Sequence, residues 1–211
     1  MDDQTQAAWS EAVIVLSNCL RHPDESVREA VSSPAGLSAA VESIERAGVE
    51  PPAAPAIEDR DLTEEYEGLF GAFRTPFAPP AASPYKEWYE GREGLMEGPP
   101  ATAMERRYAA IGADVPEAYP ADHVALELEY ASILLDAGEI EELRRFVESE
   151  LDWIDAFARL VEDAAAEAPF HRWSVKTLVE AMAALRSELD VDGPSEERID
   201  RMVDRARTNV V

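Results

Sequence analysis

The densest group of side chains that could do chemistry lies between Asp122 and Glu129. On a helix, His123 and Glu127 are four positions apart and share one face, and Asp122 and Glu129 are seven apart and share another. An imidazole beside carboxylates points to metal binding or acid–base catalysis, but this segment has one histidine and its other positions are apolar. A structural interpretation is that Asp122 caps the helix and His123 hydrogen-bonds Glu127. We favour a third interpretation, in which carboxylates in an apolar wall accept hydrogen bonds from a bound cationic segment.

Two aromatic clusters accompany this segment. Phe170-His171-Arg172-Trp173 follows Pro169, in a break between helices, where aromatic residues usually serve packing. The segment from Pro84 to Tyr89 places Tyr85, Trp88 and Tyr89 within five residues, after a proline-rich stretch. These three rings predict either a plug of the core or an aromatic wall that binds a peptide.

Other familiar catalytic patterns are missing from the sequence. It contains neither the Gly-x-x-x-x-Gly-Lys-Ser/Thr phosphate loop nor the Gly-x-Ser-x-Gly nucleophile elbow. The single cysteine, Cys19, excludes an internal disulfide and lies on an apolar helical face, so we expect a buried small side chain rather than a nucleophile. With only three histidines in the chain, we expect no metal and no bound cofactor.

The composition is strongly acidic. The 211 residues include 44 acidic and 19 basic side chains, for a net charge of −25, yet 46% are hydrophobic, too many for a disordered acidic tail. This charge argues against a nucleic-acid partner. Only Lys86 and Lys176 are lysines, which fits a protein from a high-salt cytoplasm; an ordinary protein with an acidic functional surface is the competing interpretation.

We also expect a cytoplasmic location. Residues Met1–Ser10 carry two aspartates and no positive charge, the opposite of a signal peptide. Apolar runs such as Ala12–Leu16 are far shorter than the roughly 18 residues that a membrane-spanning helix needs, so no membrane insertion is expected.

The elements that would position these residues are helices. Apolar residues recur at helical spacing through most of the chain, and no useful strand alternation appears, which predicts an all-α helical bundle. Asp122 is predicted to cap a buried helix ending near Ala137, Glu139 to open one long helix through Val161, and Thr102 with Glu105 to form a capping box.

Prolines divide this bundle. Nine of the fifteen prolines lie between Pro51 and Pro100, and Thr75–Pro84 is expected to be an ordered loop. A second break over Ala113–Ala121 is a plausible hinge. We therefore expect an N-terminal half over 1–120 and a C-terminal half over 121–211 within one compact domain, as a monomer or as a dimer swapped across the hinge.

Four segments in this order resemble elements of the TorD/DmsD family. Glu65–Phe70 resembles the family's Tyr-x-x-Leu-Phe element, and Pro84–Met96 looks like its Pro-Tyr-Glu-Ser-Val-Tyr segment with the acidic-Gly-Leu stretch that follows. Ala121–Tyr130 is similar to the Asp-His-x-x-x-Glu-Leu-x-Phe signature, and Pro169–Trp173 resembles the later His-x-Trp element. Order and spacing agree over about residues 5–190.

The resemblance implies a non-enzymatic, all-helical cytoplasmic chaperone for complex iron–sulfur molybdoenzymes such as DMSO or TMAO reductases. Such a chaperone binds the twin-arginine signal peptide of the apo catalytic subunit until molybdopterin is inserted. Asp122 and His123 would lie at the hinge and the signal-peptide site, and Glu127 and Glu129 would receive the arginines. The implied wall and its surroundings comprise Tyr66, Tyr85, Trp88, Tyr89, Leu126, His171 and Trp173.

Three alternatives to this function remain. The chain could be a NarJ-like chaperone of a nitrate reductase, a small metal- or nucleotide-dependent enzyme using Asp122, His123 and Glu127, or a helical scaffold subunit. Two features depart from the family's pattern: the proline-rich loop after Phe73 is longer than expected, and Trp88 stands where the family usually has a smaller residue.

Overall fold

The computed structural model describes residues 1–23, 34–57, 60–71, 78–88, 96–164 and 166–208. It confirms the all-α prediction: within these ranges the only β-type pairing is an isolated antiparallel bridge between Ala81 and His123. The described helices, in chain order, are α1 (Asp3–Cys19), α3 (Pro34–Arg46), α4 (Leu62–Phe70), α5 (Pro99–Ala110), α6 (Val124–Asp136), α7 (Ile140–Ser149), α8 (Ile154–Asp163), α9 (Pro169–Leu189) and α10 (Glu196–Thr208).

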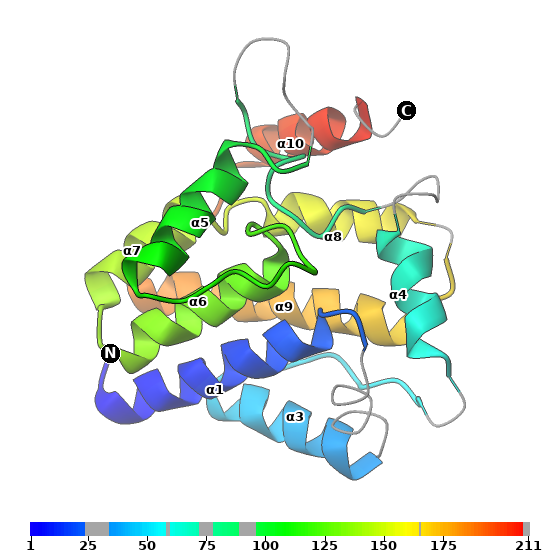
Figure 1. Ribbon diagram of the computed structural model, residues 1–211. Helices are drawn as coiled ribbons and strands as arrows, with labels where there is room; N and C mark the ends of the chain where they lie inside the picture. Colours follow the sequence, from blue (N-terminus) through cyan, green and yellow to red (C-terminus); the bar gives the residue numbers. More distant parts are fainter. Residues whose placement is uncertain (24–33, 58–59, 72–77, 89–95, 165, 209–211) are drawn as a thin grey trace.

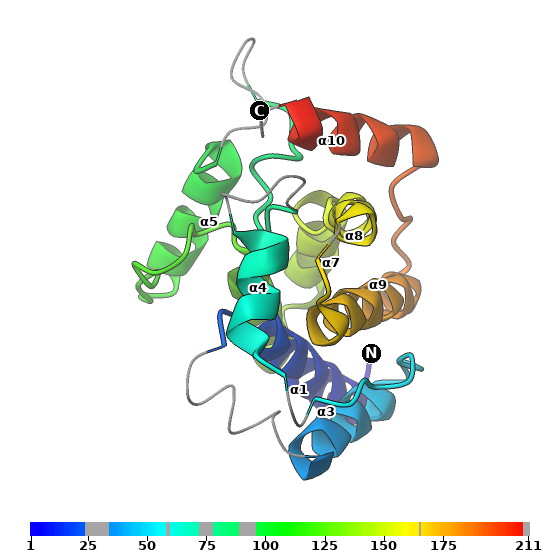
Figure 2. The same ribbon diagram turned by 90° about the vertical axis from the view of Figure 1, so that its right-hand side faces the viewer.

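Helix α6 lies at the centre of the molecule, as its sequence predicts (Figure 1). Its apolar residues surround the helix, so it needs neighbours on several sides. It packs against α1 and α7, and the hydroxyl of Ser17 in α1 donates to the carbonyl of Ala125 at 2.7 Å. Helix α9 contacts α1, α4, α7 and α8. Helix α4 therefore lies next to α9 (Figure 2).

The prediction of a single long helix from Glu139 to Val161 is wrong, because the chain turns between α7 and α8. This turn buries Leu151 and Trp153 completely and points Asp152 at two cations, Lys86 and Arg198. The carbonyl of Leu151 also accepts from Arg186 Nη2 at 3.0 Å. These long-range contacts outweigh the local helical periodicity.

The predicted capping box at Thr102 is also wrong. Helix α5 begins three residues earlier, at Pro99, with Gly98 as its N-cap and no side-chain cap. Proline suits the first helical position because its missing N–H would be unpaired there anyway. Gly98 lies against the indole of Trp88, where a Cβ atom would come within 1.9 Å of a ring carbon.

Helix α10 packs on α8 at the end of the molecule away from α1 and α3 (Figures 1 and 2). None of the helices that the structure describes combines the length and apolar character needed to cross a membrane.

Candidate functional site

The first feature of the site is a loop, residues 78–88, that is fastened to the start of α6. The amide of Ala82 donates to the carbonyl of Asp122 at 3.0 Å, and the amide of Val124 donates to the carbonyl of Pro80 at 2.8 Å. Asp122 Oδ2 accepts from the Ser83 amide at 2.7 Å and also from the Ser83 hydroxyl. Asp122 is therefore not the helix cap that the sequence predicts. Its carboxylate holds the loop.

His123 is the N-cap of α6. Its Nδ1 accepts from the amide of Ala125 at 3.2 Å, and its Nε2 lies 3.2 Å from the hydroxyl of Tyr66 in α4. Because Nδ1 is an acceptor, the neutral ring carries its proton on Nε2 and donates it to Tyr66. Burial, together with the nearby charge of Arg21, lowers the pKa of His123 to about 3. The structural interpretation in which His123 hydrogen-bonds Glu127 is wrong, because both ring nitrogens have other partners.

All three histidines of the chain gather around Tyr66. The ring centroid of Tyr66 lies 5.1 Å from that of His22 and 5.6 Å from that of His171, both in edge-on geometry. Tyr119 lies 4.6 Å from His123 and accepts the backbone N–H of His22 on its hydroxyl at 3.0 Å. We call these five residues the histidine–tyrosine cluster. His123 and His171 are buried, whereas the other three are half-buried.

Sequence reasoning missed His22 and Tyr119. His22 stands in a helix stop, His22-Pro23, and Tyr119 stands in the Ala113–Ala121 break. The sequence signal for Tyr119 was that this aromatic residue precedes Pro120 and lies three positions before Asp122. A single ring in a loop carries no periodicity, so only the fold reveals its partners.

The N-terminus of α9 completes the cluster. Glu65 Oε2 accepts from the amide of Phe170 at 3.0 Å and lies 3.7 Å from Nδ1 of the fully buried His171. Burial lowers the pKa of His171, although the Glu65 carboxylate opposes this shift. Trp173, in contrast, donates its Nε1–H to the carbonyl of Pro52 at 2.9 Å and so fixes the linker after α3.

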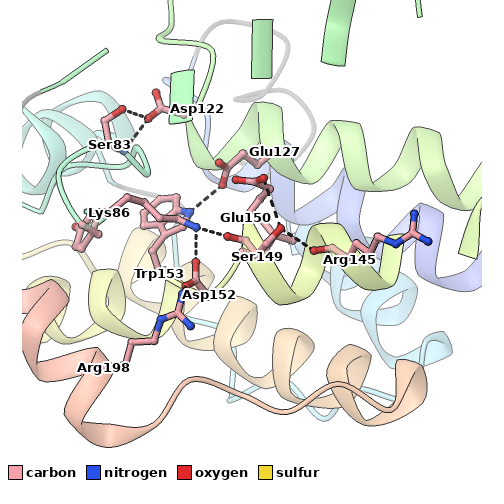
Figure 3. Close-up of polar contacts among 12 residues, drawn as sticks. Ser83, Lys86, Asp122, Glu127, Arg145, Ser149, Glu150, Asp152, Trp153 and Arg198 are labelled. Atoms are coloured by element: carbon pink, nitrogen blue, oxygen red, sulfur yellow. Dashed lines mark hydrogen bonds and ion pairs between the residues drawn. The ribbon is translucent and has the colours of Figure 1, made fainter. Parts of the chain in front are cut away.

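Glu127 is part of a separate, buried polar network (Figure 3). It has no exposed surface, and its Oε2 accepts from Trp153 Nε1 at 2.9 Å. Burial raises the pKa of Glu127 well above its ordinary value; the charge of Lys86 opposes this shift and that of Asp122 adds to it. Lys86 itself binds the carbonyl of Ser149 and the carboxylate of Asp152. Glu127 therefore lies in the core, out of reach of a partner at the surface.

Glu129 lies differently. Its side chain is 36% exposed, and its Oε2 pairs with the guanidinium of Arg21, the residue before His22. Of the two predicted arginine acceptors, Glu129 is the one at the surface. It already binds an arginine of this chain.

The predicted aromatic wall divides into core and surface. Tyr85 is fully buried, donates its hydroxyl to the carbonyl of Pro79 at 2.9 Å and stacks on Trp153 at 5.0 Å, so it plugs the core. Leu126 is fully buried too. Trp88 is half-buried, with its indole N–H donated to the carbonyl of Ser83 at 2.9 Å. Tyr89 lies outside the described residues.

Metal and thiol chemistry find little support in the described part of the chain. There, no group of three or more His, Cys, Asp or Glu side chains could hold a metal ion. Cys19 is buried as expected, and burial raises the pKa of its thiol to about 12. What the site offers is hydrogen bonds, ring edges and one carboxylate at the surface.

Comparisons with known proteins find a family and a relative that this chain resembles. The family model for the nitrate reductase delta subunit matches residues 32–164, a range that contains the 78–88 loop and all of α6. The Chaperone protein TorD of Vibrio parahaemolyticus serotype O3:K6 (strain RIMD 2210633) is 32% identical over 91 residues. That match covers 36% of this chain and 42% of the relative, so the chain spans less than half the length of the curated relative that it matches.

Proposed function

Because this chain belongs to the nitrate reductase delta subunit family, with the TorD/DmsD/NarJ chaperones, we propose that it binds the twin-arginine signal peptide of a molybdoenzyme catalytic subunit. In this proposal it holds the apo subunit in the cytoplasm until molybdopterin is inserted, and it acts by binding rather than by catalysis. It needs no cofactor of its own and works as a monomer or a hinge-swapped dimer.

The observation that carries this proposal is the position of Glu129 beside the histidine–tyrosine cluster. Arg21 and His22 are consecutive, so the Arg21–Glu129 ion pair adjoins the half-buried rings of Tyr66 and Tyr119. A twin-arginine peptide offers guanidinium groups followed by an apolar stretch. A client arginine can replace Arg21 on Glu129, since guanidinium–carboxylate hydrogen bonds are among the strong ones. The ring edges supply contact area for the rest of the peptide.

In this arrangement Asp122 and His123 are positioning residues. Asp122 fixes the 78–88 loop through Ser83, and His123 fixes Tyr66. Both act on the peptide through the residues that they hold. At high salt the apolar contacts supply most of the affinity, because the Debye length falls to about 3 Å at 1 M.

Calorimetric titration tests the proposal. Leader peptides of molybdoenzymes from the same cell would be titrated into the full chain in multimolar salt, next to copies in which both arginines are lysines. Saturable binding of one leader, weakened in the lysine copy, is the expected result. If no leader binds to the folded chain, the signal-peptide function is wrong.

The family description favours a second client class. A nitrate reductase assembly chaperone of the NarJ type fits the matched family equally well. Co-purification separates the two: capture of a nitrate reductase catalytic subunit, rather than a DMSO- or TMAO-type subunit, would assign the NarJ-like role.

A further inference from the structure

Helix α10 is an arginine-bearing amphipathic helix. Ile199, Met202, Val203 and Ala206 fall at helical spacing and are buried. Arg198, Arg205 and Arg207 flank this stripe, whereas Arg201 is exposed and pairs with Glu197 within the helix. This combination of an apolar face and guanidinium groups is also the chemistry of the peptide discussed above. The surface beneath α10 is therefore one that accepts such a helix.

Three arginines of α10 contact other parts of the chain. Arg198 pairs with Asp152, whose side chain is only 4% exposed and which also binds Lys86 (Figure 3). Arg205 Nη1 donates to the carbonyl of Tyr85 at 2.7 Å, and Arg207 pairs with Asp163 at the end of α8. A nearly buried carboxylate held between two cations is a specific anchor, unlike a surface ion pair.

The fit of α10 is incomplete along the side that faces Arg159 and Glu162 of α8. A cavity of about 460 Å³ lies between α8, α9 and the start of α10, and is lined in part by Ala158, Val175 and Ile199. Another of about 370 Å³ lies along the α8 seam, beside Val203 and Arg207. Exposed ion pairs such as Arg159 with Glu196 and Asp200 stabilise little on their own. Helix α10 is therefore held by its buried apolar stripe and by these arginine contacts, with open space along one side.

The α10 surface is continuous with the site described above. Tyr85, whose carbonyl binds Arg205, belongs to the 78–88 loop that Asp122 fastens to α6. Displacing α10 would thus extend the exposed surface from this loop along α8, over the carboxylates of Asp152 and Asp163.

We propose that α10 covers a surface that also binds the client's signal peptide, and that the arginine-bearing segment of this peptide displaces α10 from α8. This inference rests on the proposed function and goes beyond it, since it adds a second arginine-binding surface centred on Asp152. Because only molecules with an uncovered surface can bind, the apparent affinity for the leader equals the intrinsic affinity multiplied by the fraction of molecules in which α10 is displaced.

The test uses the full chain with the substitutions Arg198→Gln and Arg205→Gln together. The matched control is Arg201→Gln, because Arg201 pairs with Glu197 within α10 itself. The double variant is expected to bind the leader roughly three- to tenfold more tightly than the parent, and the control is expected to match the parent. Circular dichroism verifies that each variant is folded, and titrations use the lowest salt that keeps the chain folded.

Hydrogen exchange supplies the second readout. In the parent chain, saturating leader is expected to speed amide exchange across 196–208 while slowing it across the 78–88 loop. The displacement of α10 would be overturned if the double variant bound the leader with unchanged affinity and if exchange in α10 did not change on binding. The proposed function would then remain intact. Failure of the leader to bind any variant would overturn both.

Discussion

Asp122 accepts two hydrogen bonds from Ser83, which lies 39 residues earlier in the chain. The carboxylate is buried, and it accepts the hydrogen bonds that water would otherwise accept from the amide and the hydroxyl of Ser83. A motif that resembles a binding signature thus acts here as a clasp between a proline-rich loop and the central helix. In the proposed function, it contributes by positioning that loop.

Replacing Asp122 by alanine should destabilise the fold by about 1–3 kcal/mol, because the buried Ser83 amide loses its acceptor. Urea unfolding measures this free energy. Ser83→Ala should also destabilise the fold, because it removes the hydroxyl that donates to Asp122 and accepts from the amide of Gly98, although the Ser83 amide keeps its bond to Asp122. The double variant should cost less than the two single changes added together; strict additivity would contradict the clasp.

The buried Glu127 should make stability depend on pH. Its pKa in the folded chain is raised well above the ordinary value of 4.5, so above about pH 4.5 the folded state binds one more proton than the unfolded state. Stability from this group is therefore full below that pH and falls as pH rises toward the folded pKa.

Glu127→Gln removes this dependence. Urea titrations measure the free energy of unfolding of the Glu127→Gln variant and of the parent. The value for the variant minus the value for the parent should increase from pH 4.5 to pH 7. The exposed Glu117→Gln serves as the matched control. A constant difference across this range would show that Glu127 ionises normally.

The Arg21–Glu129 pair predicts opposite effects on leader binding. Glu129→Gln should weaken binding about tenfold, since a charge-assisted hydrogen bond contributes about 1.5 kcal/mol or more. Arg21→Gln should leave binding equal or tighter, because it frees the carboxylate for the client. Calorimetry at moderate salt measures both. Equal weakening by the two changes would mean that the ion pair itself, as a structural element, is needed.

Gly98→Ala should destabilise the chain by about 1–3 kcal/mol through overpacking against Trp88. The backbone of Gly98 has φ −87°, which alanine adopts freely, so the cost comes from the indole alone. Thermal unfolding should show a smaller cost of Gly98→Ala in a Trp88→Ala background. An equal cost in both backgrounds would place the strain elsewhere.

Much of the fold could be predicted because helices are encoded locally. The apolar spacing of α1, α6 and α9 and the positive φ of Gly48, Gly112 and Gly138 follow from short stretches of chain. The buried, central place of α6 followed from its apolar residues on all faces.

The roles of the polar residues could not be predicted in the same way. His123 caps α6 in place of the predicted Asp122, whose carboxylate binds Ser83 instead, and Ser83 and Tyr66 arrive from distant segments. The α7–α8 turn exists because Asp152 and Trp153 have partners on the 78–88 loop, α6 and α10.

The sequence by itself determined the helical class, the candidate residues and the family, since periodicity and motif order survive without knowledge of neighbours. The tertiary structure alone decided that Glu127 is buried, that Glu129 is already paired with Arg21 and that three histidines surround Tyr66. Burial and electrostatic pairing depend on which distant segments meet, and no local pattern records that.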